Sequence, residues 1–107
     1  TPADLRLLAE ADLPEGCAVA NNYGDAGQWI PALRGRPITT PHVHVVFFEE
    51  VRGSMHPCTA FRGEKRPYFV DTVPCPGRAC ALQAAVGGAK LYRIVDSTLE
   101  VRIDQFR

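Results

Sequence analysis

The chain has 107 residues, with 12 Lys and Arg, 12 Asp and Glu, and a formal net charge of +0 at pH 7. This length predicts a single domain over residues 1–107 with a modest core. The balanced charge argues against a nucleic-acid partner, and no uncharged run is long enough to span a bilayer.

The first half of the chain predicts a helix, a strand, a second helix and a second strand. Thr1 can cap a helix over residues 1–12, and the apolar residues 17–20 suit a buried strand. A polar turn follows, and Asp25 is a good N-cap for a helix over residues 25–33 that Gly35 closes. Residues 36–40 are expected to form a short second strand. Residues 42–51 suit either a strand or a helix.

The second half is expected to begin with a loop over residues 53–65, which are rich in Gly, Ser, Pro and charges. A third strand over 67–73, a short helix over 79–86 and a hairpin of strands 90–95 and 99–106 follow. Together these elements predict an α/β fold with a small two-layer or three-layer, mainly parallel sheet. It has a Rossmann-like β-α-β start and a C-terminal antiparallel hairpin.

Four cysteines are many for so short a chain. Cys75 and Cys80 flank a Pro-Gly turn that can bring their sulfurs together, and Cys17 and Cys58 are free to pair in space. An even number of cysteines with a turn-closed pair indicates an oxidising, extracytoplasmic setting. The alternative is that Cys17 is only a small buried apolar residue in a strand.

The polar turn Asn21-Asn22-Tyr23-Gly24-Asp25 leaves a strand and enters a helix, an arrangement that favours an anion or a hydroxylated ligand. The same residue types also simply form turns and cap helices, so both interpretations stay open. The glycine spacing matches neither a dinucleotide loop nor a P-loop, and we expect no cofactor.

The histidines offer weak metal candidates. His42 and His44 would share one face of a strand, and His56, Cys58 or Glu49 could complete a site. The spacing matches no established zinc motif. No Ser or Cys lies in a recognisable nucleophile motif, so we expect no catalytic residue in this chain.

A longer pattern resembles the soluble extracytoplasmic domain of multi-spanning membrane glycosyltransferases of the GT-C architecture. Thirteen positions match that pattern: Leu13, Pro14, Asn22, Gly24, Asp25, Trp29, Pro31, Ala32, Leu33, Gly35, Arg36, Pro41 and His42. Further similarity lies in Tyr68-Phe69-Val70 and in the C-terminal hairpin. The chain begins with Thr1 rather than Met, and we expect it to be a piece of a longer membrane protein.

The resemblance implies an accessory domain on the extracytoplasmic face of the membrane. It would orient a glycan, a lipid-linked sugar or a protein partner beside the membrane helices of the parent chain, and it would not be catalytic alone. The residues expected to bind are Asn21, Asn22, Tyr23, Asp25, Trp29, Arg36 and His42. Two alternatives remain: a stand-alone small-molecule or metal-binding domain that uses His42 and His44, and a structural protein-interaction module.

Overall fold

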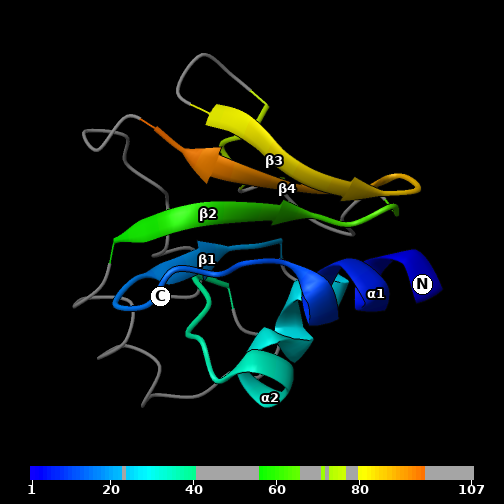
Figure 1. The fold of residues 1–107 in the computed structure, drawn as a ribbon, viewed down its shortest axis with the longest axis horizontal. Coiled ribbons are helices and arrows are strands. Elements are labelled where there is room, and N and C mark those ends of the chain that lie inside the picture. The colour runs from blue at the N-terminus through cyan, green and yellow to red at the C-terminus, as the bar shows by residue number, and fades with distance from the viewer. Residues whose placement is uncertain (23, 41–55, 66–70, 72, 77–79, 96–107) are drawn as a thin grey trace.

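The computed structural model describes residues 1–22, 24–40, 56–65, 71, 73–76 and 80–95. These residues form helices α1 (Pro2–Glu10), η1 (Ala26–Trp29) and α2 (Ile30–Arg34), of which η1 is a 3-10 helix. The strands are β1 (Ala18–Ala20), β2 (Pro57–Arg62), β3 (Cys80–Val86) and β4 (Ala89–Ile94). Figure 1 shows the strands stacked as one twisted sheet, with the helices gathered near β1.

The sheet has the order β1-β2-β4-β3. Only β1 and β2 are parallel, whereas β2 pairs antiparallel with β4, and β4 pairs antiparallel with β3. The predicted mainly parallel, Rossmann-like sheet is therefore wrong. The described residues form a small mixed α/β fold in which antiparallel pairing dominates.

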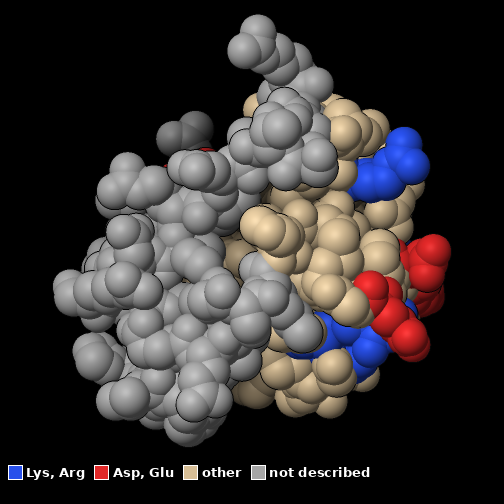
Figure 2. Space-filling model, turned by 90° about the vertical axis from the view of Figure 1, so that its left-hand side faces the viewer, with Lys and Arg blue, Asp and Glu red and all other residues tan. Residues whose placement is uncertain are grey.

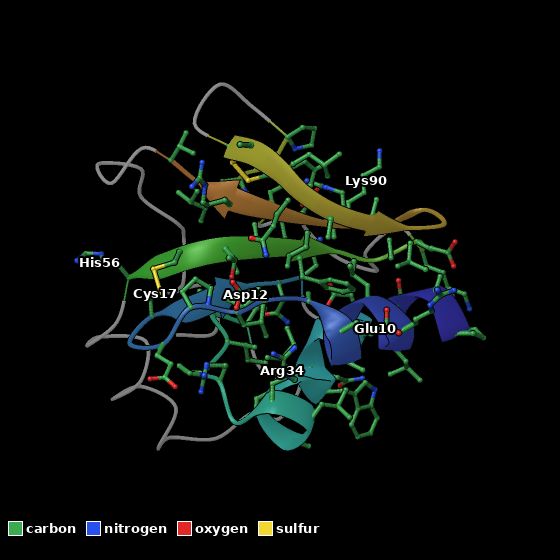
Figure 3. All side chains as sticks on the ribbon, in the orientation of Figure 1. Glu10, Asp12, Cys17, Arg34, His56 and Lys90 are labelled. Carbon is green, nitrogen blue, oxygen red and sulfur yellow. A yellow bond between two sulfur atoms is a disulfide. The ribbon has the colours of Figure 1, made fainter. Side chains whose placement is uncertain are left out.

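Helix α1 begins as the sequence predicts. The Thr1 hydroxyl accepts a 3.2 Å hydrogen bond from the Asp4 N–H, and Pro2 occupies the first turn. The end of the helix is held by another element, because Arg34 Nη1 donates to the carbonyl oxygens of Leu8, at 2.9 Å, and Ala11, at 2.6 Å. A basic side chain on the last carbonyls of a helix is a favourable cap. Arg34 thus fastens α2 to α1, as Figure 3 illustrates.

The predicted second strand over 36–40 is reduced to one parallel bridge between Val19 and Ile38. Val19 N–H donates to the Pro37 carbonyl at 2.9 Å, and Thr39 N–H donates to the Val19 carbonyl at 3.1 Å. This short contact supplies β1 with a neighbour on the edge that β2 does not cover. It also brings Thr39 and Thr40 beside the end of β1.

Two other predictions are wrong. Part of the expected loop 53–65 is β2, which lies inside the sheet between β1 and β4. The expected helix over 79–86 is β3, which pairs with β4 across the turn at Gly87-Gly88, and six of its seven residues have a partner there. The strand predicted over 90–95 is confirmed as β4. The predictions for 42–51 and 99–106, and the body of the strand predicted over 67–73, lie outside the described residues.

Each face of the sheet has its own apolar cluster. On the helical face, Val19, Phe61 and Leu91 pack with Leu7 and Leu8 of α1 and with other buried residues. Strand side chains alternate between faces, so Ala20, Ala60 and Tyr92 lie on the opposite face, where they pack with Val73 and Cys75. The second face is therefore covered by the segment around residues 73–76 rather than by a helix.

Both suggested cysteine pairs are disulfides. Cys17–Cys58 joins the residue before β1 to β2, and Cys75–Cys80 joins the covering segment to the first residue of β3. Figure 3 shows Cys17 bonded at the beginning of β2. The first bond therefore ties the start of β1 to β2, and the second fixes the 73–76 segment to the sheet.

Candidate binding site

The predicted polar turn is built around the amide of Asn21. Its Nδ2 donates to the carbonyls of Thr40, at 2.8 Å, and Asn22, at 3.1 Å, while its Oδ1 accepts from the Thr40 N–H at 2.9 Å. The Asn21 N–H donates to Thr39 Oγ1 at 3.3 Å. This reciprocal contact closes the end of β1 against the chain that follows α2.

Asn21 and Asn22 are 0% and 1% exposed. Buried polar groups need such internal hydrogen bonds, since leaving them unsatisfied would cost stability. In this arrangement Asn21 links two segments inside the molecule, and both asparagine side chains are turned away from solvent. Their role in binding a ligand stays a prediction.

Asp25 holds the turn together from the other side. Its two carboxylate oxygens accept from the N–H of Asn22, at 3.0 Å, and of Gly27, at 2.8 Å, so it caps η1 as predicted. Gly24 supplies the left-handed backbone of the turn, with φ 82°. Burial raises the pKa of Asp25 to about 6, against the opposing effect of these hydrogen bonds.

Of the predicted site residues that the structure describes, Trp29 is the one that faces solvent. Its side chain is 53% exposed at the end of η1, and Leu33, four residues later on the same helical face, is 48% exposed. Gly35 ends α2 in the left-handed conformation, with φ 65°, as expected for a closing glycine. An exposed indole so placed is available to a partner or a ligand.

Arg36 is half-buried and donates through Nη2 to Glu15 Oε1 at 3.3 Å. Its Nε is buried with no hydrogen-bond partner among the residues that the structure describes. Tyr23 and His42, the remaining predicted site residues, lie outside those residues. The structure thus brings Asn21, Asn22 and Asp25 into one turn, with Trp29 at the end of the helix that the turn begins.

The metal hypothesis loses one of its candidate ligands. Cys58 is bonded to Cys17, so its sulfur is not a free thiolate. His56 lies just before β2 and points away from the sheet in Figure 3. Within the described ranges, no three His, Cys, Asp or Glu side chains gather in a way that could hold a metal ion. His42, His44 and Glu49 lie outside them.

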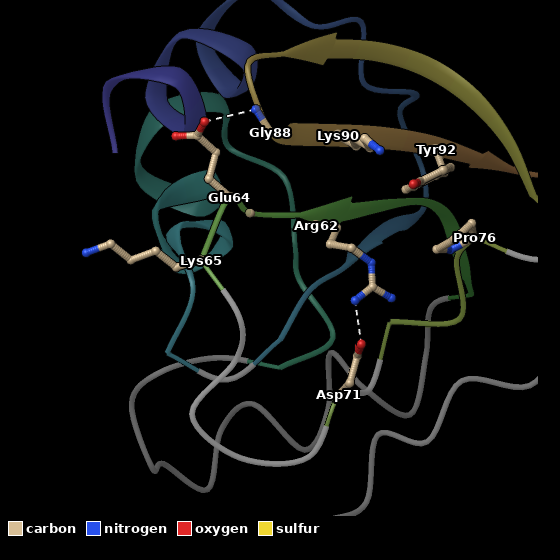
Figure 4. Close-up of a pocket in the computed structure, with 9 residues that line it drawn as sticks. Arg62, Glu64, Lys65, Asp71, Pro76, Gly88, Lys90 and Tyr92 are labelled. Carbon is tan, nitrogen blue, oxygen red and sulfur yellow. Dashed lines mark hydrogen bonds and ion pairs between the residues drawn. The ribbon is translucent and has the colours of Figure 1, made fainter.

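A groove that the sequence did not predict lies on the sheet face opposite the helices. Its volume is about 760 Å³, and Arg62, Lys90, Tyr92 and Pro76 are among the residues that line it. Arg62 and Lys90 are directly opposite each other on β2 and β4, as are Ala60 and Tyr92. Figure 4 shows the side chains of Arg62, Lys90 and Tyr92 around one space, with Lys65 extending away from it.

Arg62 is held in place by the segment that covers this face. Its Nε donates to the Cys75 carbonyl at 2.9 Å, its Nη2 to the Val73 carbonyl at 3.3 Å, and its Nη1 pairs with the Asp71 carboxylate. A planar guanidinium suits several such acceptors at once. The Arg62 side chain is therefore held in one position at the side of the groove.

The sequence does not identify these groove residues, because it predicts a loop over residues 53–65. A strand at residues 57–62 would have placed Arg62 on the same face as Ala60. The signal that could have found the groove is the pair of like charges, Arg62 and Lys90, on neighbouring strands. That signal depends on strand register, which a single sequence does not specify.

Outside the groove, the surface carries both acidic and basic side chains. Figure 2 shows acidic and basic side chains close together along one side of a face of the molecule, in keeping with the formal net charge of +0. In the part of the chain that the structure describes, no helix is long and apolar enough to cross a membrane. No family model, curated protein or solved structure matches this chain.

Proposed function

We propose that this chain is an extracytoplasmic accessory domain of a membrane glycosyltransferase-like protein, and that it binds a glycan at the surface around Trp29. The support for binding is the exposed indole, 53% accessible, on a helix that a buried turn holds in place. The support for the parent protein is the resemblance carried by residues 13–42. The domain binds and orients, and no residue of it is assigned a catalytic role.

The two disulfides support the proposed location. Structural disulfides form and persist in oxidising compartments, and both pairs here are consistent with an extracytoplasmic environment. A small domain with a modest core also gains stability from such bonds. Placement at a membrane is part of the proposal and rests on the resemblance.

The chemistry of Trp29 favours a sugar. One face of a pyranose ring presents C–H groups, and that face packs well on a flat indole, whose N–H can also donate a hydrogen bond. Asp25 acts indirectly: its carboxylate caps the short helix that ends at Trp29, so the indole is presented from a fixed backbone.

The test is a titration of the oxidised protein with neutral oligosaccharides, followed by NMR of backbone amides and of the Trp29 indole N–H. Saturable shifts centred on residues 24–36 are expected. Trp29→Ala should weaken binding about tenfold or more, because an aromatic contact is lost. Leu33→Ala, which removes exposed apolar surface from the same helical face, should change affinity by about twofold or less.

The proposal fails if no neutral oligosaccharide shifts the Trp29 indole, or if Trp29→Ala and Leu33→Ala weaken binding equally. Circular dichroism of both variants checks that they are folded. The parent reading frame provides a separate test. We expect membrane helices in it, and a parent protein without them would rule out the membrane part of the proposal.

A further inference from the structure

We propose that the groove between Arg62, Lys90 and Tyr92 binds an oxyanion, a carboxylate or a phosphate attached to a ring or chain that lies along Tyr92 and Pro76. This site goes beyond the glycan surface at Trp29. It lies on the opposite face of the sheet, because the helices cover the face of Phe61 and Leu91. It uses different residues and a different chemistry.

The first argument is the pairing of like charges. Arg62 and Lys90 are register partners on β2 and β4, and both side chains project from the groove face. Like charges directly opposite each other in an antiparallel pair are unfavourable. Asp71 offsets this repulsion from the Arg62 side only, and an anion in the groove gains a charge-assisted hydrogen bond from the Lys90 ammonium.

The second argument is the balance of charge within the groove. Asp71 neutralises Arg62, but among the described residues no carboxylate lies within ion-pair distance of Lys90. Glu64, the other acid of the groove, is already engaged: its Oε2 accepts from the Gly88 N–H at 2.9 Å and its Oε1 from the Thr1 hydroxyl at 2.7 Å. Among the described residues, no acid therefore neutralises the Lys90 ammonium, whose charge is left for a ligand.

The third argument is the apolar surface beside the Lys90 ammonium. Tyr92 is 6% exposed and packed with Ala60 and Cys75, so its ring is fixed while it lines the groove. Pro76 contributes a second apolar surface. A fixed aromatic ring, a fixed guanidinium and an ammonium with no ion-pair partner among the described residues together suit a ligand with one apolar face and one negative group.

The experiment compares three probes at constant ionic strength: inorganic phosphate, glucuronic acid and neutral glucose. Backbone NMR shifts should map to residues 60–64, 71–76 and 88–92 for the first two probes and be absent for glucose. If only glucuronic acid saturates the groove, the natural ligand carries a carboxylate. If only phosphate does, the ligand carries a phosphoryl group. If both do, the groove recognises negative charge in general. Each of these results supports the site.

Two lysine variants provide the matched comparison. Lys90→Gln should weaken anion binding about tenfold, since one charge-assisted contact is lost, whereas Lys65→Gln should change it by about twofold or less. Both substitutions remove one positive charge from an exposed side chain near the groove. Equal weakening by both variants would indicate diffuse attraction and overturn the proposal, as would the absence of saturable shifts with either anion.

The two sites can fail separately. Trp29→Ala should leave anion affinity unchanged, and Lys90→Gln should leave neutral oligosaccharide binding unchanged. Thermal unfolding of Lys90→Gln checks the fold. If Trp29→Ala abolishes anion binding in a folded protein, the anion occupies the helical face and the groove assignment is wrong.

Discussion

The hydroxyl of Thr1 donates a 2.7 Å hydrogen bond to Glu64 Oε1, across 63 positions of sequence. The same carboxylate accepts from the Gly88 N–H at 2.9 Å, and the Glu64 N–H donates to Asp4 Oδ1 at 3.0 Å. Glu64 thus joins the start of α1, the chain after β2 and the β3–β4 turn. The Gly88 N–H, and then the Thr1 hydroxyl, hold the pKa of Glu64 below its usual value.

We expect Glu64→Gln to lower stability near neutral pH and to have less effect in acid. A lowered carboxyl pKa means that the native state favours the ionised form, so this stabilisation is present above the unfolded pKa and is lost as pH falls through the native value. Urea unfolding at several pH values measures the difference between wild type and variant. Glu10→Gln is the control, since Glu10 lies in an exposed pair with Arg6. A difference that is unchanged from neutral pH to acid would contradict the prediction.

The contribution of Asp25 to stability should depend on pH in the opposite way to that of Glu64. Burial raises its pKa from 3.8 to about 6, so the native state binds the proton more tightly than the unfolded chain. Its contribution to stability is therefore complete below pH 3.8 and is lost as pH rises to about 6. By linkage, the change is about 3 kcal/mol.

Asp25→Asn removes this titration. The variant's free energy of unfolding, measured relative to wild type, should increase by about 3 kcal/mol between acid and neutral pH, because only wild type loses stability there. Urea unfolding of both proteins at matched pH gives this difference and cancels the contribution of Glu64. Parallel curves for the two proteins would show that Asp25 is solvated in the native state.

Strand β3 is the element for which the prediction from the sequence is most clearly wrong. Its residues, Cys80 to Val86, include three alanines, and alanine has the highest helix propensity. Pairing with β4 overrides that preference, as tertiary contacts commonly do. The Gly87-Gly88 pair suits the end of a helix, but two glycines between apolar segments are also a hairpin signal. Gly87 has φ 58°, as a tight hairpin turn requires.

The local features of the candidate site could be predicted, but its long-range contacts could not. The Asp25 cap and the closing Gly35 depend on neighbouring residues, and both are confirmed. The burial of Asn21 depends on Thr39 and Thr40, which lie 18 and 19 positions away. No short-range pattern encodes that contact. The groove depends in the same way on the register between Arg62 and Lys90.

The two disulfides should differ in their contribution to stability. Cys17 and Cys58 are separated by 41 positions, Cys75 and Cys80 by 5. The entropy of closing these loops in the unfolded chain predicts about 4 kcal/mol for the first bond and about 2 kcal/mol for the second. Urea unfolding of the double variants Cys17→Ala/Cys58→Ala and Cys75→Ala/Cys80→Ala, each with the other bond intact, tests the order.

Thiol titration of the denatured, unreduced wild type is the control, and it should find no free thiol among the four cysteines. The reverse order of stability would show that the short bond is more than a local link. It would then hold the 73–76 segment on Tyr92 and Ala60, where Val73 and Cys75 pack.

Gly27 is the position in the candidate site where one methyl group should matter most. A Cβ there would lie 2.6 Å from Asn21 Cβ and 3.2 Å from Phe61 Cδ2, both within the packed interior. Gly27→Ala must therefore move the η1 helix away from the turn, at a cost of about 1–3 kcal/mol for overpacking. It should also change the fluorescence of Trp29, two residues later.

Gly35→Ala separates this steric effect from backbone strain. Gly35 has φ 65° and open space around its Cα, so alanine there meets strain of about 1 kcal/mol and no clash. Its substitution should leave the Trp29 spectrum unchanged, since the Asn21–Asp25 turn is untouched. Urea unfolding and Trp29 fluorescence of the Gly27→Ala and Gly35→Ala variants test these two expectations. If Gly27→Ala is tolerated with an unchanged spectrum, η1 is not packed on Asn21 and Phe61 as described, and the rigid presentation of Trp29 loses its basis.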